Sequence, residues 1–324
     1  MKVAILDDYQ RAAPSLACFS LLAAHDVHVF SDTLRDEAQL AARLVDFDAV
    51  VLIRERTRVA ASLVAKLPRL RLVVQTGKIG VHVDVNACNA RGITVCDSTG
   101  SPVSTAELAW GLIIASARNV IPESERLRKG RWQGGVGFVL AGKRLGLLGF
   151  GRIAQRLARY AKVFEMDVSV WGRESTLARA GDAGLRTCRS MRDLFAESDV
   201  LSVQLRLNDE TRGIVRYEHL AAMSPESMFV NTSRAELVEA GALERALREG
   251  RPGRAALDVY ENEPLFGDVP SFLALPQVTA TPHLGYVERE SYERYFGDAF
   301  DAVNAFAAGK PVRVVAPAQG AAKR

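Results

Sequence analysis

A chain of 324 residues is long enough for two domains, each with a hydrophobic core of its own. Its apolar fraction of 48% and its charged fraction of 25% are those of an ordinary soluble globular protein. The net charge of +4 comes from 42 basic and 38 acidic residues scattered along the chain. The sequence contains no basic block, which argues against nucleic acid as a partner.

The apolar runs and the cysteines indicate where the protein is located and what it does not bind. The apolar runs of the sequence are shorter than a membrane span, and the N-terminal strand turns acidic at Asp7-Asp8, too early for a signal peptide. The cysteines show neither metal-ligand spacing nor a paired framework, which is typical of reduced core thiols. They are Cys18, Cys88, Cys96 and Cys188. We therefore expect a cytoplasmic protein that binds no metal and no membrane.

Residues 1–100 alternate between predicted strands and predicted helices. Apolar runs predict strands at 3–6, 27–30, 49–53 and 70–75, and the segments between them predict helices at 12–24, 37–44 and 62–67. This alternation is typical of a parallel sheet in an α/β domain. It contains no glycine-rich phosphate turn, so we expect this domain to serve a ligand other than a nucleotide.

Two loops at predicted strand ends are candidate substrate contacts in this domain. Arg54-Glu55-Arg56-Thr57 follows one strand, and Thr76-Gly77-Lys78-Ile79-Gly80 follows the next. Open α/β sheets bind ligands at the carboxyl ends of their strands, so both loops are placed to contact a substrate. Exposed backbone N–H groups beside the glycines would suit a carboxylate. The alternatives are a solvated charge run for the arginines and plain turns for the glycines.

A domain boundary is predicted near residue 100, where Ser101-Pro102 interrupts the pattern. Ser104-Thr105-Ala106-Glu107 has the pattern of a capping box and predicts a helix from there to Ala117. That helix is apolar nearly all round, so we expect it between layers or at a subunit contact. The glycine-rich segment 130–137 predicts a loop.

The most informative stretch runs from residue 143 to residue 174. A buried strand predicted at 145–148 breaks at Gly149-Phe150-Gly151-Arg152-Ile153-Ala154, an amphipathic helix follows, and a second strand is predicted at 168–171. The first glycine permits the tight turn, the second lets a pyrophosphate approach, and the small alanine lets the helix lie close. The helix N-terminus offers N–H groups to an anion. An ordinary β-α turn is the alternative, which the strand-motif-helix-strand order disfavours.

The alternation resumes beyond this stretch. Strands are predicted at 200–205, 228–231, 255–259 and 278–280, with helices at 191–197, 217–223 and 243–249 between them. Together they complete a doubly wound sheet. The helix predicted at 288–308 has an aromatic face, and we expect it to cross back and complete the first domain. The tail after Val315 is predicted to be disordered.

Three predicted strand ends of the second half carry charged or titratable residues. Arg234, Glu263 and His283 follow successive strands beside the predicted dinucleotide site. Arginine can hold a carboxylate with its planar fork. Histidine can pass a proton to or from a carbinol oxygen, and a carboxylate partner fixes its tautomer. This set suits hydride transfer on a 2-oxo or 2-hydroxy acid. His283 without its neighbours would be read as structural, as are His25, His28, His82 and His219.

Five ordered motifs resemble those of one family. They are Gly149 to Ala154, Glu210-Thr211-Arg212-Gly213, Asn231 to Ala235, Ala256 to Pro264, and Thr281-Pro282-His283-Leu284-Gly285. Over nearly its whole length the chain is similar to the D-isomer-specific 2-hydroxyacid dehydrogenases. The resemblance implies two doubly wound parallel-sheet α/β domains. A Rossmann NAD(P)-binding domain at 101–283 would be inserted into a discontinuous flavodoxin-like substrate-binding domain at 1–100 plus 284–324. It also implies a deep cleft and a homodimer.

The same resemblance implies roles for single residues. Arg234 would bind the substrate carboxylate and carbonyl oxygen, His283 would be the acid/base, and Glu263 would be its partner. Asp258 would lie near the nicotinamide carboxamide. The cofactor would be lined by Thr105, Gly149, Gly151, Arg152, Ile153, Thr211, Thr232 and Gly285. The other domain would offer the substrate Arg54, Gly77, Lys78 and Ile79, with Arg56 as second choice.

Departures from the family pattern concern the cofactor and the substrate. Many NAD-dependent members carry an acidic residue after the second strand, where this chain has Gly172-Arg173. Arg173 can pair with a 2′-phosphate, so we predict that NADP(H) is accepted and even preferred. The alternative is a solvated Arg173, with Glu174 or Ser175 serving the ribose of NAD. Gln204 and Arg206 replace the usual His and Pro, and Lys78 is unusual in its loop.

Two other functions remain open from the sequence. One is a formate dehydrogenase-like enzyme, although such enzymes have Gln where this chain has Glu263. The other is a dinucleotide-sensing regulatory protein on the same fold, similar to corepressors. Retention of Arg234, Glu263 and His283 together favours turnover, which the fold alone would not. The sequence leaves the substrate acid open.

Overall fold

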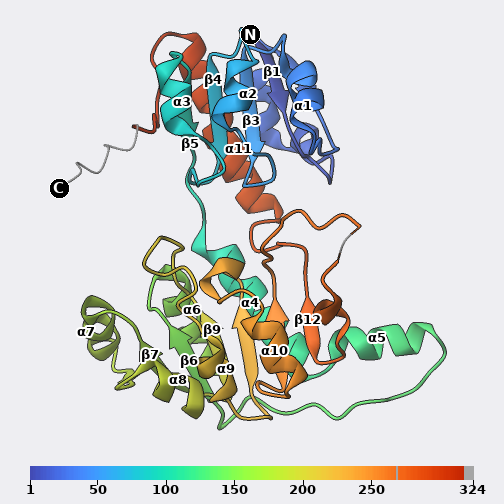
Figure 1. Ribbon diagram of the computed structural model, residues 1–324, viewed down its shortest axis with the longest axis vertical. Coiled ribbons are helices and arrows are strands. Elements are labelled where there is room, and N and C mark those ends of the chain that lie inside the picture. Colours follow the sequence, from blue (N-terminus) through green and yellow to red (C-terminus); the bar gives the residue numbers. More distant parts are fainter. Residues whose placement is uncertain (268, 317–324) are drawn as a thin grey trace. The chain divides into compact units, whose positions relative to one another are not determined.

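The computed structural model describes residues 1–267 and 269–316, and the chain forms two compact units (Figure 1). The first unit combines residues 1–101 with those from 287 on, and the second comprises Pro102–Tyr286. The second unit ends at 286, rather than at 283 as the sequence predicts. The Asp258 carboxylate accepts hydrogen bonds from the N–H groups of Leu284 and Gly285, which holds the loop 281–285 within this unit. The predicted disorder concerns residues 316–324, and all of these except Ala316 lie outside the described residues.

The first unit contains a parallel sheet of five strands in the order β2-β1-β3-β4-β5. The strands are β1 (Lys2–Ile5), β2 (Asp26–Val29), β3 (Ala49–Ile53), β4 (Leu72–Thr76) and β5 (Thr94–Asp97). Every residue of β3 and β4 is buried, as expected for strands covered on both faces. This is the flavodoxin-like order, so the predicted α/β fold class is confirmed for this unit.

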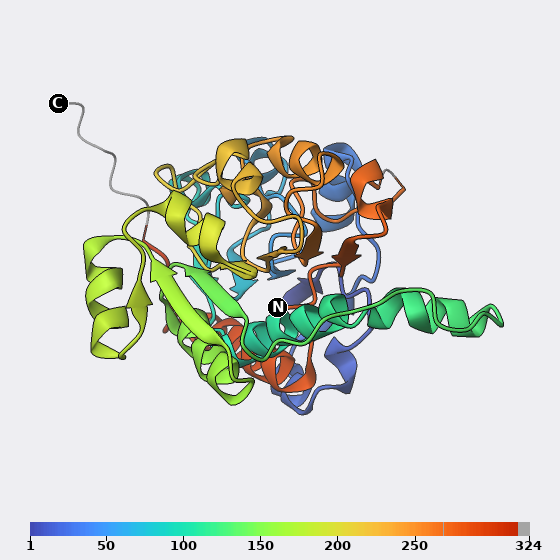
Figure 2. The same ribbon diagram turned by 90° about the horizontal axis from the view of Figure 1, so that it is seen from below.

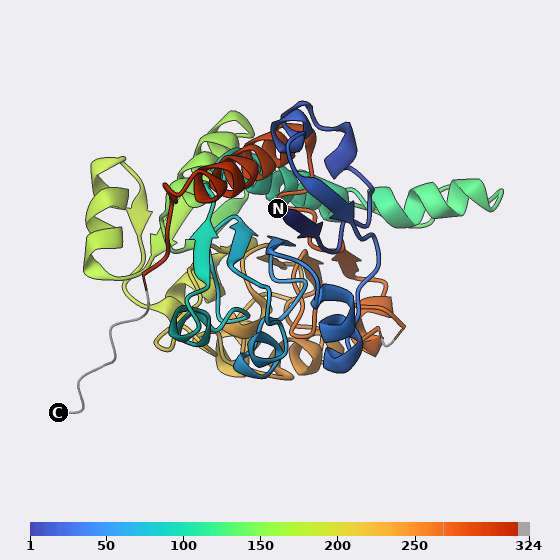
Figure 3. The ribbon, with the colours of Figure 1, turned by 90° about the horizontal axis from the view of Figure 1, so that it is seen from above.

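Helices cover both faces of this sheet. They are α1 (Glu37–Leu44), α2 (Ala61–Ala65), α3 (Val85–Ala90) and α11 (Arg289–Ala307). Seen from above, α11 lies along the sheet, where it packs on β4 and buries Tyr292, Tyr295, Phe296 and Phe300 (Figure 3). The helix predicted at 12–24 is wrong: two short 3₁₀ helices, η1 (Ala13–Ser15) and η2 (Ala17–Leu22), take its place. Pro14 has no N–H to donate, and Leu16 is extended between the two.

The second unit contains a parallel sheet of seven strands in the order β12-β11-β10-β9-β6-β7-β8. They are β6 (Arg144–Leu148), β7 (Asp167–Trp171), β8 (Arg186–Thr187), β9 (Val200–Val203), β10 (Met228–Asn231), β11 (Arg254–Leu257) and β12 (Val278–Ala280). The first strands are added on one side of β6 and the later strands on the other, so the order reverses between β6 and β9 (Figure 1). A dinucleotide binds at this reversal in Rossmann folds. The predicted fold class is confirmed here as well.

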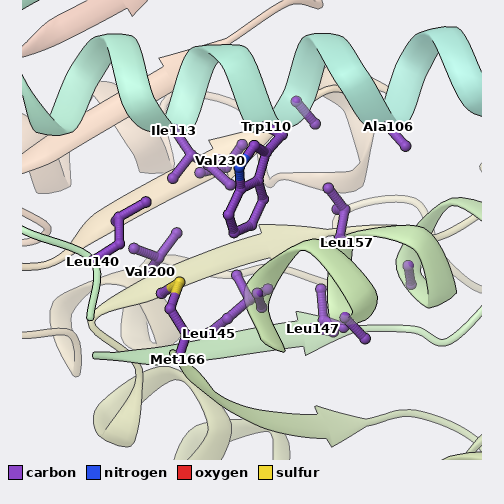
Figure 4. Close-up of a cluster of buried hydrophobic side chains, with 14 of the residues drawn as sticks. Ala106, Trp110, Ile113, Leu140, Leu145, Leu147, Leu157, Met166, Val200 and Val230 are labelled. Atoms are coloured by element: carbon purple, nitrogen blue, oxygen red, sulfur yellow. The ribbon is translucent and has the colours of Figure 1, made fainter. Parts of the chain in front are cut away.

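The helices of the second unit include one, α4 (Pro102–Ala117), of which half the residues are buried. The others are α5 (Val120–Arg128), α6 (Arg152–Val163), α7 (Glu174–Asp182), α8 (Met191–Glu197), α9 (Tyr217–Ala221) and α10 (Ala242–Arg248), with 3₁₀ helices η3 (Ala235–Leu237) and η4 (Ser271–Ala274). Trp110 and Ile113 of α4 point into the core formed with Leu145, Leu157 and Val200 (Figure 4).

The predicted start of α4 is wrong. The helix begins at Pro102, and Ser104 lies buried in its first turn instead of capping it. Proline favours the first helical position because its φ is already helical and its missing N–H would have no partner there. The capping-box pattern at 104–107 is therefore coincidental.

A second helix of this unit, α5, leaves the body of the unit without burying a single residue (Figure 2). The loop after it folds back, and the Glu123 carboxylate accepts hydrogen bonds from the N–H groups of Gly134 and Gly135. We call residues 120–139 the arm. The arm exposes large apolar side chains, among them Leu127 at 61% and Trp132 at 75%. The sequence predicts the loop of the arm but not its helix.

Candidate functional site

The phosphate turn follows β6 with the geometry that its glycines require. Gly149 has φ +95°, and a Cβ there would lie 2.7 Å from the carbonyl oxygen of Gln204, so only glycine fits. Gly151 is the N-cap of α6, and open space surrounds the position of its missing Cβ. No side chain of the N-cap covers the first N–H groups of α6. The turn and the helix N-terminus therefore present free donors to an anion.

Two buried polar atoms at neighbouring strand ends lack partners within the protein. Thr232 Oγ1 follows β10 and Gln204 Oε1 follows β9, and neither has a hydrogen-bond partner among the described residues. Both side chains are buried, with 5% and 9% exposed. Buried polar atoms are normally satisfied in native proteins, so these two fit a ligand with polar groups of its own. Together with the phosphate turn, they fit a dinucleotide at the reversal of the sheet.

A histidine-carboxylate pair lies at the same edge of this sheet. His283 follows β12 with a left-handed φ of 52°, and its Nδ1 is hydrogen-bonded to the Glu263 carboxylate. The other oxygen of Glu263 accepts from the backbone N–H of Tyr260 at 2.7 Å. The two side chains are 16% and 24% exposed. With Nδ1 facing the carboxylate, Nε2 is the ring atom left for a reacting group.

Asp258 holds the loop that carries the histidine. Its carboxylate accepts from the hydroxyl of Thr281 at 2.7 Å and from the backbone N–H groups of Leu284 at 2.7 Å and Gly285 at 2.8 Å. Burial raises the pKa of this carboxyl, and the hydrogen bonds act in the opposite direction. On the other side, Thr105 of α4 donates to the carbonyl of Gly285 at 2.9 Å. The loop 281–285 is therefore fixed from both sides.

Arg234 follows β10, two strands from the histidine loop. Its backbone carbonyl accepts from the Asn231 amide at 2.9 Å, and its guanidinium donates to the carbonyl of Ser233 at 2.6 Å. The side chain is half-buried. Because β10, β11 and β12 are neighbours in the parallel sheet, Arg234, Glu263 and His283 all belong to loops at one edge of the sheet.

The first unit brings its predicted substrate residues together. Ile53 and Thr76 are paired at the ends of β3 and β4, which places Arg54 beside Gly77. The Arg54 side chain lies over the α-carbon of Gly77, which has φ +95° and could carry no side chain there. Lys78 Nζ pairs with Asp97 at 2.8 Å and stays largely exposed. Ile79 is partly buried against the core of the unit.

The remaining predicted cofactor residues have mixed surroundings. Arg152 is exposed at the start of α6, and Ile153 packs partly against the core. The Thr211 hydroxyl donates to the carbonyl of Arg206 at 2.7 Å and closes its own loop. Arg173, the N-cap of α7, pairs with Glu210 in that loop.

Three contributions escape the sequence reasoning. They are the anchoring contacts of Asp258, the backbone N–H of Tyr260 that orients Glu263, and the buried amide oxygen of Gln204. Asp258 and Tyr260 belong to the motif from Ala256 to Pro264, so their closeness in sequence to Glu263 is the one signal that could have revealed the first two contributions. Along the described ranges, no helix could cross a membrane and no cluster of three or more His, Cys, Asp or Glu could hold a metal ion.

Comparisons with known proteins show the family of the chain. Residues 110–285 match the family model of the D-isomer specific 2-hydroxyacid dehydrogenase NAD binding domain. The chain is 38% identical to a glyoxylate reductase of Aeropyrum pernix, with 78% of each chain covered. It is 37% identical to an (S)-sulfolactate dehydrogenase of Chromohalobacter salexigens, over 82% of this chain and 86% of that one.

Phosphoglycerate oxidoreductases are similar in sequence and in structure. A D-3-phosphoglycerate dehydrogenase of Mycobacterium leprae is 35% identical over 85% of this chain, which spans about half (52%) of that protein. The crystal structure of a phosphoglycerate oxidoreductase from Vibrio cholerae is 49% identical, covers 95% of this chain and 99% of its own, and superposes with a TM-score of 0.93. Motifs, fold and relatives agree, and the chain belongs to the D-isomer-specific 2-hydroxyacid dehydrogenases.

Proposed function

We propose that this protein reduces a 2-oxo acid to its D-2-hydroxy acid, and catalyses the reverse reaction, with a nicotinamide dinucleotide. The observation that carries the proposal is the His283–Glu263 pair, held at the same sheet edge as the phosphate turn. A proton donor with a half-buried carboxylate partner beside a dinucleotide site is what carbonyl reduction needs. The names of the relatives support the reaction class without fixing the acid.

The chemistry divides among the residues of the second unit. When bound, the dinucleotide supplies the hydride for C2 of the substrate. His283 delivers a proton from Nε2 to the carbonyl oxygen, and Glu263 stabilises the imidazolium that donates it. The Arg234 guanidinium holds the substrate carboxylate and draws charge from the carbonyl oxygen. Oxidation runs through the same groups in reverse.

Residues of both units complete the proposal. Thr232, Gln204, Gly149, Gly151 and the N-terminus of α6 would hold the dinucleotide through the free donors and acceptors described above. The loop of Thr105, Asp258 and Gly285 would border its nicotinamide end. From the first unit, substrate contacts are proposed for Arg54, Gly77, Lys78 and Ile79.

We propose that NADP(H) is accepted as well as NAD(H). Gly172 offers no carboxylate to repel a 2′-phosphate, and Arg173 stands next to it with an exposed guanidinium. A substituent at Gly172 would meet the Thr176 side chain at 2.7 Å, so the position also favours glycine for packing.

We further propose a cytoplasmic homodimer formed through the arm. A helix with no buried residue and a loop that exposes Trp132 need a surface to cover them. A second copy can supply it, because a two-fold axis would bury the same patch on both chains.

The test is oxidation of NADH and NADPH with a panel of 2-oxo acids. Glyoxylate, hydroxypyruvate and pyruvate sample small substrates. Phosphohydroxypyruvate and sulfopyruvate, suggested by the relatives, sample substrates with a second anionic group. We expect turnover with at least one acid. Tight cofactor binding without turnover on any acid would favour a dinucleotide sensor instead, and oxidation of formate with NAD would favour the formate dehydrogenase alternative.

A further inference from the structure

An ion pair joins two exposed loops of the second unit. The Arg173 guanidinium, at the end of β7, is paired with the Glu210 carboxylate, in the loop that follows β9. The side chains are 67% and 75% exposed, so burial does not force them together. In most exposed positions such an ion pair contributes little to the stability of the fold. A role for this pair must therefore be sought in its position in the fold.

The place of this pair is defined by the strand order. β6 lies between β7 and β9, and Leu148 at its end is level with Trp171 on one side and Val203 on the other (Figure 1). The pair therefore links the loops that flank the phosphate turn. Ligands of such sheets bind in the crevice between the loops at the reversal, with the adenosine half beyond the second strand of the fold. Arg173 and Glu210 lie in the loops after β7 and β9, where we expect the adenosine half.

Each partner is presented by a fixed piece of backbone. Arg173 is the N-cap of α7, and its carbonyl accepts from Thr176 N at 2.8 Å. The loop of Glu210 is closed by the Asn208 side chain, which accepts from the N–H groups of Glu210 at 3.1 Å and Thr211 at 3.0 Å. A change of partner thus requires side-chain rotation only.

We propose that Glu210 sets the balance between NADP(H) and NAD(H) by competing with a 2′-phosphate for Arg173. The inference rests on the proposed dinucleotide binding. A 2′-phosphate carries more negative charge than a carboxylate and can take over both hydrogen-bonding faces of the guanidinium. Glu210 repels that phosphate and occupies its partner, so it lowers the affinity for NADP(H). NAD(H) has no 2′-phosphate that could pair with Arg173, so its affinity should hardly depend on whether Arg173 is paired with Glu210.

The experiment measures dissociation constants of NADPH and NADH by fluorescence titration of the full chain. The variants are Glu210→Gln, Arg173→Gln and Arg179→Gln. Arg179 is the matched control, because it is another exposed arginine, within α7, and its guanidinium donates to the Thr176 hydroxyl at 3.4 Å. We expect Glu210→Gln to tighten NADPH about threefold to tenfold, roughly the range of a partly screened charge. NADH should change less than about twofold under this account.

The other variants complete the prediction. Arg173→Gln should weaken NADPH binding by about tenfold. In the double variant, Glu210→Gln should have no further effect, because the guanidinium for which Glu210 and the phosphate compete is gone. Arg179→Gln should leave both cofactors as in the wild type. Equal effects of Glu210→Gln on both cofactors, or none, with both still bound, would overturn this inference alone. Binding of neither cofactor by the wild type would overturn the proposed function together with it.

Discussion

At the scale of single residues, the site depends on groups whose orientation is set by neighbours. His283 is the clearest case, since its backbone adopts a left-handed φ that non-glycine residues avoid. Such conformations persist when the surrounding structure enforces them and are found preferentially at functional sites. Here the enforcing contacts are those of Asp258 and Thr105 to Leu284 and Gly285.

Glu263→Gln tests the role of the carboxylate beside the histidine. The amide can keep the hydrogen bond from Tyr260 N, but it cannot stabilise an imidazolium. We expect kcat to fall by about ten- to a hundredfold, with the cofactor dissociation constant unchanged. Steady-state kinetics and a binding titration on the same sample measure both. A variant with wild-type kcat would show that Glu263 has no part in proton transfer.

The thiols give a pH-dependent prediction. Burial raises the pKa of Cys18 to about 12 and that of Cys88 and Cys96 to about 11, from an ordinary 9.0. An acid whose pKa is raised is less ionised, so at pH 8 the reactive thiolate of Cys88 is about a hundredfold scarcer than in a free thiol. Alkylation by iodoacetamide, followed by mass spectrometry, should be correspondingly slow in the native protein and fast after unfolding. Native labelling at the rate of a small peptide thiol would contradict this.

How far the sequence predicts the site can be judged from these residues. The rule that ligands bind at the carboxyl ends of strands predicts Arg234, Glu263 and His283 at one edge of the sheet. The strands that precede these residues are neighbours in the sheet. The rule does not predict that Asp258 anchors the histidine loop, because that contact depends on where β11 and β12 end relative to each other. It also does not reveal the partnerless oxygen of Gln204, which is a property of its buried surroundings.

At the scale of elements, the phosphate turn and the helix after it form the strongest local prediction. Strand, glycine turn and helix occur at the predicted places, and the positive φ and close neighbours of Gly149 give that glycine a steric reason to be there. Elements without such a reason were predicted less well. The segment 12–24 has apolar residues at helical spacing, but Pro14 and the extended Leu16 divide it into 3₁₀ turns. The helix α5 was missed because it has no apolar face packed on a core.

Gly149→Ala tests whether the phosphate turn requires glycine at this position. A methyl group there would lie 2.7 Å from a backbone carbonyl oxygen in a backbone conformation that alanine avoids. We expect loss of dinucleotide binding and a melting temperature lower by several degrees, roughly 1–3 kcal/mol of destabilisation. The control is Gly181→Ala in α7, where the Cβ meets nothing within 4 Å and helix propensity improves. Equal effects of the two changes would remove the special role of Gly149.

At the scale of the whole molecule, the chain combines two parallel sheets of different strand order, each with its own core. The sequence predicts this division because the strand-helix alternation is interrupted near residue 100 and resumes with the glycine turn. The proposed homodimer rests on the surface of the second unit rather than on its core. The arm leaves large apolar side chains mostly exposed, among them Leu127 and Trp132.

The arm prediction is tested by Leu127→Ser combined with Trp132→Ser. If a second copy covers the arm, the double variant should dissociate to monomers at concentrations where the wild type is dimeric, as measured by sedimentation velocity. Val163→Ser is the control, because Val163 is 79% exposed and belongs to α6 rather than to the arm. It should leave the dimer intact. A monomeric wild type, or a dimer unaffected by the arm variant, would contradict the proposed interface.

The central claim is hydride transfer from a nicotinamide to C2 of a 2-oxo acid, with His283 as proton donor. Its most direct test is a reaction with cofactor deuterated stereospecifically at C4, followed by mass spectrometry and chiral chromatography of the product. One of the two deuterated forms should place a single deuterium at C2 of a D-2-hydroxy acid. His283→Ala should lower this turnover by about 10²- to 10⁴-fold while cofactor binding survives. A product without deuterium, a racemic product, or wild-type turnover in the His283 variant would contradict the account.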